Sequence, residues 1–243
     1  MKKKGIYAIF SNVDGVRMTE KDYLDLDLIA KDCNLFDASD VNCVIQKIQA
    51  LDEIYEHENL FKIYNYFLSV SRNPEILMNV IQCADRIRDK ASLSALLDLL
   101  LMKNIDDEKD LFINVRAMCA KAIANLKDTS AVTPLLYCLN NKDENYKVRL
   151  ACADALGRIG DRYAVAPLIE VVKDEEEKSV YVKESATFAL GLLGDVSAID
   201  PLVSIMEAKQ GLLGKFSFLK ERIVEALGKL NINNSKVLKV LKN

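Results

Sequence analysis

The sequence repeats itself at intervals of 33 and 34 residues, and no other feature restricts the fold as strongly. Counted from a Val that is followed by Arg or Lys, the clearest copies share an Ala after seven residues and an Asp after thirteen, and they close on Pro-Leu. The shared alanines are Ala122, Ala155 and Ala189. A period of this length is typical of solenoid proteins, in which each repeat buries its apolar face against the next.

Each copy has the pattern of two helices. In the middle copy, apolar residues from Val148 onward recur every three or four residues, as they do on one face of an α-helix. Gly160 suits the left-handed conformation that ends a helix, and Asp161 favours the start of the next helix by capping it. Pro167 falls near the first turn of that helix, where a missing N–H does little harm. The pattern predicts helical pairs at 115–126 with 131–140, at 148–159 with 164–173, and at 182–193 with 198–208.

Weaker copies extend the array in both directions. Cys83 and Ala50 hold the alanine position in two earlier copies, and Ala226 holds it in a last copy that follows an insertion. We therefore predict about six repeats over 41–243, with the sharpest copies at 115–208.

Residues 1–40 do not fit the repeat and are expected to form a non-repeat arm and a capping helix. Ile6–Phe10 favours a short extended segment. Thr19, followed by Asp22, favours the start of a helix over roughly 20–33.

The repeat resembles the HEAT repeat, specifically the short HEAT-like type first named from phycobilisome lyases. The resemblance is carried by ALGRIGDRYAVAPL at 155–168 and ALGLLGDVSAIDPL at 189–202, with VR at 148–149 and VK at 182–183. It covers roughly Val41 to Leu241. It implies an all-α fold, a right-handed α-solenoid (α-α superhelix) of helical hairpins. In such an array the first helices lie on the convex side and the second helices line a concave surface that binds partners.

Charge and composition argue against a nucleic-acid-binding function. Lys plus Arg number 33 against 36 for Asp plus Glu, giving a net charge of −3. The HEAT-like alkylpurine DNA glycosylases need a positive groove with aromatic residues, yet the outward positions expected on the second helices include one Lys and no Arg. We expect no nucleic-acid partner, and nucleic-acid repair is the least favoured function.

The location is expected to be cytoplasmic. The apolar stretch near the N-terminus is too short for a signal peptide, and no stretch approaches the length of a membrane span. The six cysteines contain no C-x-x-C pair, and several occupy helical core positions, which favours buried thiols in a reducing compartment. Cys119 and Cys152 occupy the same inward position in successive repeats, so we expect both to be buried and unpaired.

The single histidine, His57, lies between Glu56 and Glu58 and is the one candidate for a metal site. Deoxyhypusine hydroxylases are HEAT-repeat di-iron enzymes that use several His-Glu pairs, whereas this chain has one. We therefore expect His57 to be a solvated residue in a turn, and we expect no metal and no cofactor.

Six charged residues recur in register and form the structural positions of the repeat. We assign them to capping and to contacts between neighbouring repeats, with no catalytic role. The acidic loop Lys173–Lys178 is expected to be solvated. The six positions are Arg116, Asp128, Arg149, Asp161, Lys183 and Asp195.

These observations favour a non-enzymatic scaffold or assembly factor that binds another protein, as part of a multi-subunit complex. Tyr137 is the expected anchor, and the nearby carboxylates favour a partner segment that bears Lys or Arg. Ile6–Phe10 and Leu212–Phe218 are secondary docking candidates. The alternative is a bilin-lyase-like or cofactor-enzyme maturation subunit, which leaves a lyase-type activity open. The expected partner-binding residues on the concave face are Asp98, Tyr137, Glu170, Asp200, Ser204 and Glu207.

Overall fold

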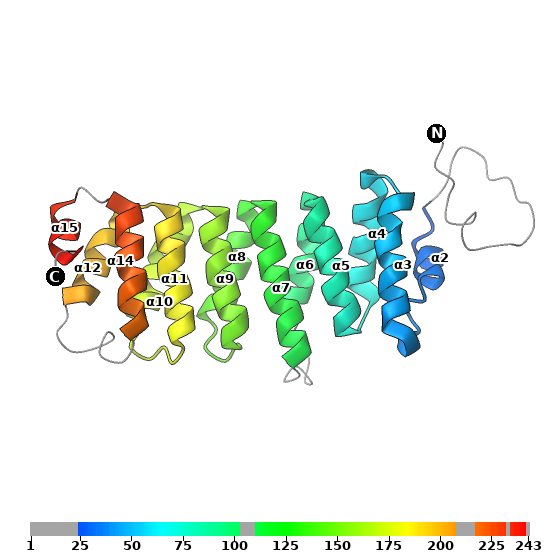
Figure 1. Cartoon of the computed structure of the whole chain (residues 1–243), viewed down its shortest axis with the longest axis horizontal. Coiled ribbons are helices and arrows are strands. Elements are labelled where there is room, and N and C mark those ends of the chain that lie inside the picture. The colour runs from blue at the N-terminus through cyan, green and yellow to red at the C-terminus, as the bar shows by residue number, and fades with distance from the viewer. Residues whose placement is uncertain (1–23, 103–109, 208–216, 232–233, 242–243) are drawn as a thin grey trace, which may run out of the picture. The chain divides into compact units, whose positions relative to one another are not determined.

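The computed structural model describes residues 24–102, 110–207, 217–231 and 234–241 (Figure 1). All regular structure in these residues is helical, with thirteen α-helices and five short 3-10 helices. The all-α prediction is therefore confirmed. The expected extended segment Ile6–Phe10, the helix start at Thr19 and most of the loop Leu212–Phe218 lie outside the described residues.

The chain divides into two compact units, residues 1–99 and 100–243. In the first unit α4 packs against both α5 and α2, and α3 packs against α5. The rings of Tyr64 and Phe67 from α4 are fully buried in its core. Its helices are α2 (Leu26–Asp32), α3 (Val41–Ile54), α4 (His57–Val70), α5 (Pro74–Ile87) and most of α6 (Leu93–Leu101).

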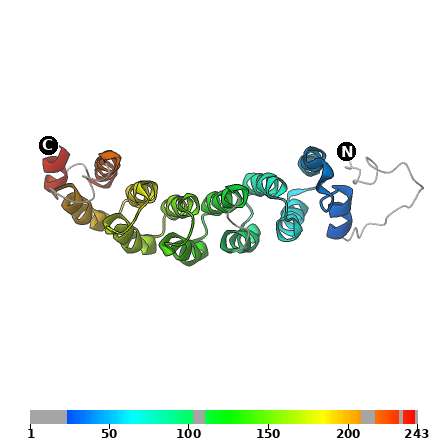
Figure 2. The ribbon, with the colours of Figure 1, turned by 90° about the horizontal axis from the view of Figure 1, so that it is seen from below.

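The second unit contains the sharp repeats. The first helices α7, α9, α11 and α14 pack against one another in succession, while α8, α10 and α12 form a second row (Figure 2). The three predicted helical pairs are all present as α7 with α8, α9 with α10, and α11 with α12. The bounds are α7 (Asp110–Leu126), α8 (Val132–Asn140), α9 (Tyr146–Ile159), α10 (Val165–Lys173), α11 (Val180–Leu193), α12 (Ile199–Glu207), α14 (Ser217–Asn231) and α15 (Ser235–Leu241).

The turn between the paired helices repeats in detail. Gly160 and Gly194 end α9 and α11 with φ values of +86° and +68°, which a residue with a Cβ adopts only under strain. Lys127 holds the corresponding place after α7 with φ 54°. The next residue in each repeat is the recurrent Asp. It caps a 3-10 turn that precedes the second helix.

Close packing of the first helices bends the second unit. A Cβ added at Gly157 in α9 would lie 2.6 Å from the Cα of Ala189 in α11, and one added at Gly191 in α11 would lie 3.2 Å from the Cα of Ala226 in α14. These small residues bring the first helices close together, so their row is the shorter one. Figure 2 accordingly shows α9, α11 and α14 on the inner side of the bend. This differs from the implied arrangement, in which second helices line the concave side.

None of the helices in the described residues combines the length and apolar character that crossing a membrane requires.

Candidate partner-binding surface

The in-register basic residues are buried and hold neighbouring repeats together. Arg149 in α9 donates from Nε to the backbone oxygen of Leu139 at 2.8 Å, and its Nη2 donates to the carboxylate of Glu177 at 2.5 Å. Arg116 makes the same pair of contacts one repeat earlier, with the backbone oxygen of Leu100 at 2.9 Å and with Glu144. Each arginine thus joins the C-terminal end of one second helix to the loop that follows the next second helix.

Lys183 takes the third place in this series and is fully buried. Its ammonium donates to the backbone oxygens of Val172, at 2.9 Å, and Asp174, at the end of α10. Burial lowers the pKa of Lys183, because the protein interior disfavours the charged form. Carbonyl oxygens at a helix C-terminus are suitable acceptors for this cation.

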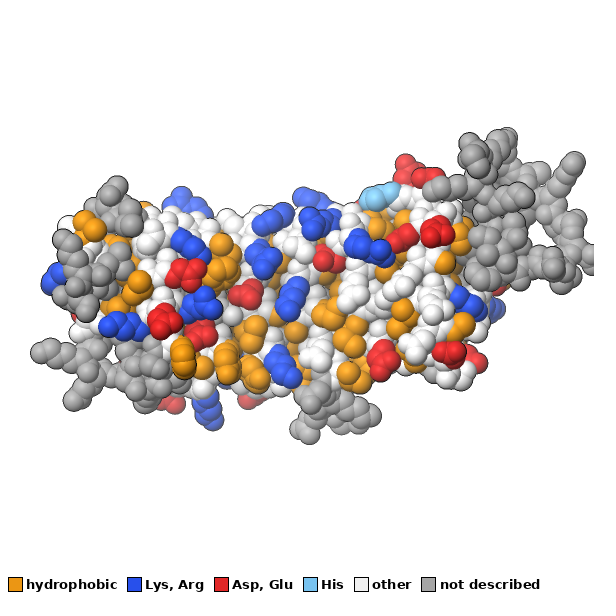
Figure 3. Space-filling view, viewed as in Figure 1, with side chains coloured by type: hydrophobic (Ala, Val, Ile, Leu, Met, Phe, Trp, Pro, Cys, Tyr) orange, Lys and Arg blue, Asp and Glu red, His pale blue; other side chains and the backbone are white. Residues whose placement is uncertain are grey.

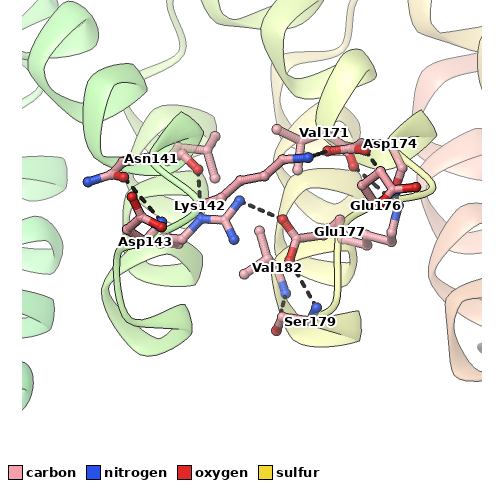
Figure 4. Close-up of polar contacts among 12 residues, drawn as sticks. Asn141, Lys142, Asp143, Val171, Asp174, Glu176, Glu177, Ser179 and Val182 are labelled. Carbon is pink, nitrogen blue, oxygen red and sulfur yellow. Dashed lines mark hydrogen bonds and ion pairs between the residues drawn. The ribbon is translucent and has the colours of Figure 1, made fainter.

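The loop between α10 and α11 was expected to be solvated, but one of its side chains is buried. Glu177 is buried against Arg149, although its neighbours Glu175 and Glu176 are exposed. Figure 4 shows Lys142 from the preceding loop reaching Asp174, where the ammonium and carboxylate are 2.7 Å apart. The sequence held a signal for the buried glutamates, since Glu144 and Glu177 each follow an in-register arginine by 28 residues.

The recurrent aspartates have structural partners. Asp128, Asp161 and Asp195 each accept a hydrogen bond from the backbone N–H two residues later, at 2.9–3.0 Å. Asp195 also binds Arg162 of the preceding repeat at 2.8 Å. Capping and contact between repeats account for these carboxylates.

The six residues expected to bind a partner are all exposed, but they belong to different units. Asp98 lies on α6 in the first unit, whereas the other five lie on α8, α10 and α12 of the second. In the second unit the structure places Tyr137 and Glu170 beside adjoining hollows, which share Asn140 as a lining residue.

The hollow beside Tyr137 is an open groove of about 620 Å³, here called the second-helix groove. Tyr137 and Tyr163 are 62% and 70% exposed, and none of the lining residues carries a charge. Sequence reasoning missed Tyr163 because it lies in the 3-10 turn before α10, outside the helical register. The groove is lined by Thr133, Leu136, Tyr137, Asn140, Asn141, Tyr163 and Pro167.

Acidic side chains are exposed on the second helices α10 and α12. Glu170 lines the adjoining hollow of about 350 Å³ and lies 3.8 Å from the ammonium of Lys173. On α12, the exposed Glu207 lies 3.5 Å from the ammonium of Lys239 in α15. Asp200 and Ser204 are exposed on the same helix.

The first-helix face of the second unit carries charges of both signs, which Figure 3 shows interspersed. Asp154 lies on this face in α9. Burial raises its pKa, while a hydrogen bond to Ser185 and the charges of Arg158 and Lys121 act in the opposite direction.

His57 is exposed at the start of α4. Its Nδ1 lies 4.0 Å from a carboxylate oxygen of Asp89, and its Nε2 lies 3.5 Å from the backbone oxygen of Ile87. Within the described residues, no cluster of three or more His, Cys, Asp or Glu is arranged to hold a metal ion.

Cys119 and Cys152 are buried and unpaired, as predicted. Burial raises the pKa of the Cys119 thiol. A hydrogen bond with Cys138 and burial both raise the pKa of Cys152. These thiols are therefore poor nucleophiles.

Comparison with known proteins identifies the repeats. Residues 107–180 and 134–212 match the family of HEAT repeats. Among solved structures, human deoxyhypusine hydroxylase in complex with glycerol is similar, with 14% sequence identity, a TM-score of 0.37, and coverage of 89% of this chain and 88% of that one. A likeness at this level bears on neither activity nor ligands. No curated protein matches the sequence. Residues 107–212, somewhat less than half of the chain, are thus similar to HEAT repeats.

Proposed function

We propose that this protein is a non-enzymatic scaffold or assembly factor, and that it holds a segment of another protein in the second-helix groove. The observation that supports the proposal is the pairing of Tyr137 and Tyr163, both exposed, on an uncharged groove of about 620 Å³. Tyrosine is a favourable anchor because it offers a large apolar ring and a hydroxyl with few rotatable bonds to immobilise.

The charges exposed on the second helices of this unit favour one kind of segment. Glu170, Asp200 and Glu207 are exposed on α10 and α12, where Lys173 is the exposed cation. A segment with a large apolar residue next to Lys or Arg therefore complements both the groove and these carboxylates. Such charges act chiefly on orientation and on the rate of encounter.

The test selects random displayed peptides against the immobilised protein and measures the binding of the selected peptides by fluorescence anisotropy. We expect selected sequences to be rich in aromatic or aliphatic residues flanked by Lys or Arg. The double variant Tyr137→Ala with Glu170→Lys should weaken binding at least about tenfold, as removal of a central anchor does.

The matched control changes the same residue types away from the groove. Tyr181→Ala with Glu176→Lys alters one exposed Tyr and one exposed Glu and should leave peptide affinity unchanged. Deleting Lys2–Phe10 tests the N-terminal arm. Full binding by the groove variant, combined with lost binding after the deletion, would contradict the proposal.

The HEAT-like repeat subtype supports a second candidate, a bilin-lyase-like or cofactor-enzyme maturation subunit. Its support is the likeness of 155–168 and 189–202 to the lyase-type repeat. An absorbance titration of the protein with a linear tetrapyrrole tests it, and a saturable red shift would favour it over the scaffold. For either function we propose a cytoplasmic setting, because the six cysteines, all within the described residues, form no disulfide.

A further inference from the structure

The first helices of the second unit all begin with an exposed, large apolar side chain. These side chains belong to the first or second residue of α7, α9, α11 and α14, and they are 41–68% exposed. Figure 3 shows hydrophobic side chains along the lower edge of this unit, below α11, α9 and α7. We call the four residues the edge row: Leu111, Tyr146, Tyr181 and Phe218.

Packing within the chain does not require these residues to be apolar. In α9 and α11, Val148 and Val182 lie close to the start of the helix and are fully buried, so they supply its contact with the repeat core. The rings of Tyr146 and Tyr181 instead stack on each other, with centroids 5.9 Å apart and planes inclined by 28°. Both line an open groove of about 800 Å³. An exposed apolar row of this kind marks an interaction surface.

We propose that the edge row binds the edge row of a second copy of this chain, in antiparallel order. The row is evenly spaced along the sequence, at intervals of 35, 35 and 37 residues. A two-fold axis that lies in the interface, crosses the row and passes between α9 and α11 relates the two copies. It sets the edge row of the second copy against that of the first in reverse order. Tyr146 then faces Tyr181 of the second copy, and Leu111 faces Phe218. Closed two-fold pairing is the commonest symmetry of soluble oligomers.

The charges on the edge are compatible with this pairing. Lys142 and Asp143 from the loop before α9, and Glu176 and Lys178 from the loop before α11, line the same groove, and Lys142 is also paired with Asp174 within the chain. The two-fold axis sets each loop opposite the other loop of the second copy. Each loop contributes one cation and one anion to this contact, so the facing loops have no excess of either charge that would repel the second copy.

The available area predicts the strength of the pair. A fully covered aromatic side chain removes about 150–250 Å² from water, so the exposed parts of the row offer roughly 400 Å² per copy. With the flanking loops, the pair buries on the order of 1,000 Å², at the lower end for specific interfaces. The dimer is therefore a weak one, with a micromolar dissociation constant. No residue of the edge row lines the second-helix groove, so the dimer carries two open grooves.

Sedimentation equilibrium of the full chain, over about 1–200 µM, tests the dimer, since that range brackets a micromolar constant. The double variant Tyr146→Glu with Tyr181→Glu places carboxylates in the first turns of α9 and α11, which the helix dipole favours. It should raise the dissociation constant at least about tenfold. The control, Tyr137→Glu with Tyr163→Glu, changes two exposed tyrosines outside the row and should leave the constant within about twofold. Circular dichroism and thermal melting verify that both variants fold.

A wild-type chain that stays monomeric across this range overturns the proposal, and so does a dimer that the edge variant leaves intact.

The order of pairing has its own test. When the Tyr146→Cys and Tyr181→Cys variants are mixed with a short bis-maleimide, the mixture should give more covalent dimer than either variant alone. Preferential cross-linking of the Tyr146→Cys variant with itself would exclude the antiparallel order. Peptide binding by the monomeric edge variant tests the second-helix groove separately, so the two proposals fail independently.

Discussion

Nη2 of Arg149 lies 2.5 Å from a carboxylate oxygen of Glu177, and the two side chains are 6% and 3% exposed. The same buried pair, Arg116 with Glu144, occurs one repeat earlier. A loop that carries three consecutive glutamates is thereby fastened to the helix of the preceding repeat. The contact between repeats in this protein therefore includes an ionic ladder as well as apolar packing.

Removing one member of this ladder should destabilise the fold strongly. Glu177→Ala leaves the guanidinium of Arg149 buried without its carboxylate, and such changes cost about 3–5 kcal/mol. Glu176→Ala, at the exposed neighbouring position, should change stability by no more than about 0.5 kcal/mol. Urea denaturation followed by circular dichroism measures both. Equal midpoints for the two variants would show that the pair contributes nothing.

Gly157 is required by the close approach of α9 and α11. In Gly157→Ala the new Cβ would lie 2.6 Å from the Cα of Ala189, so the helices must move apart, at about 1–3 kcal/mol. Gly228 in α14 has nothing within 4 Å of an added Cβ. Gly228→Ala should therefore stabilise the protein by about 0.5–1 kcal/mol through helix propensity. Thermal melting compares the two variants, and a shift of the same sign in both would refute the packing argument.

Asp195 should contribute acid-dependent stability. The backbone N–H of Ser197, its hydroxyl and Arg162 bind the carboxylate and lower its pKa to about 2. An unfolded Asp has a pKa near 3.9, so this contribution is fully present above about pH 4 and is lost as the pH falls towards 2. NMR titration of the carboxyl carbon should give a midpoint near 2. In Arg162→Ala the midpoint should rise, and an unchanged midpoint would exclude the contact between repeats as a cause.

Cys119 and Cys152 should resist modification in the folded protein. Both side chains have no exposed surface, and burial raises the pKa of Cys119. A bulky maleimide should therefore label them only as fast as the protein unfolds. Half-buried Cys43 provides an internal reference for a more accessible thiol. Labelling of Cys119 at the rate of Cys43 would contradict the packing described here.

The sequence predicted the helical pairs of the second unit and their turns because both depend on local signals. Gly160 and Asp161 are recognisable from position alone; Gly160 ends α9 as expected, while Asp161 caps the 3-10 turn that precedes α10 instead of α10 itself. Glu177 and Tyr163 were not predicted. The burial of Glu177 depends on Arg149, 28 residues away, and Tyr163 lies in a turn that helical periodicity does not cover.

The curvature of the second unit also escaped prediction. It depends on how closely Gly157 approaches Ala189, compared with the spacing of the second helices. The curvature reflects the contacts between successive first helices and those between successive second helices. Neither set of contacts can be read from the sequence of a single repeat. The residues expected to bind a partner are exposed, but that Tyr137 and Glu170 lie at adjoining hollows depends on tertiary packing.

Fluorine NMR of protein labelled with 3-fluorotyrosine tests the central claim most directly. A selected peptide is added to the labelled protein, and the tyrosine resonances are assigned by single Tyr→Phe variants. Binding in the second-helix groove predicts saturable shifts of the Tyr137 and Tyr163 resonances, while Tyr146 and Tyr181, which do not line that groove, keep their positions. Saturable shifts confined to Tyr146 and Tyr181, with Tyr137 and Tyr163 unchanged, would contradict the account.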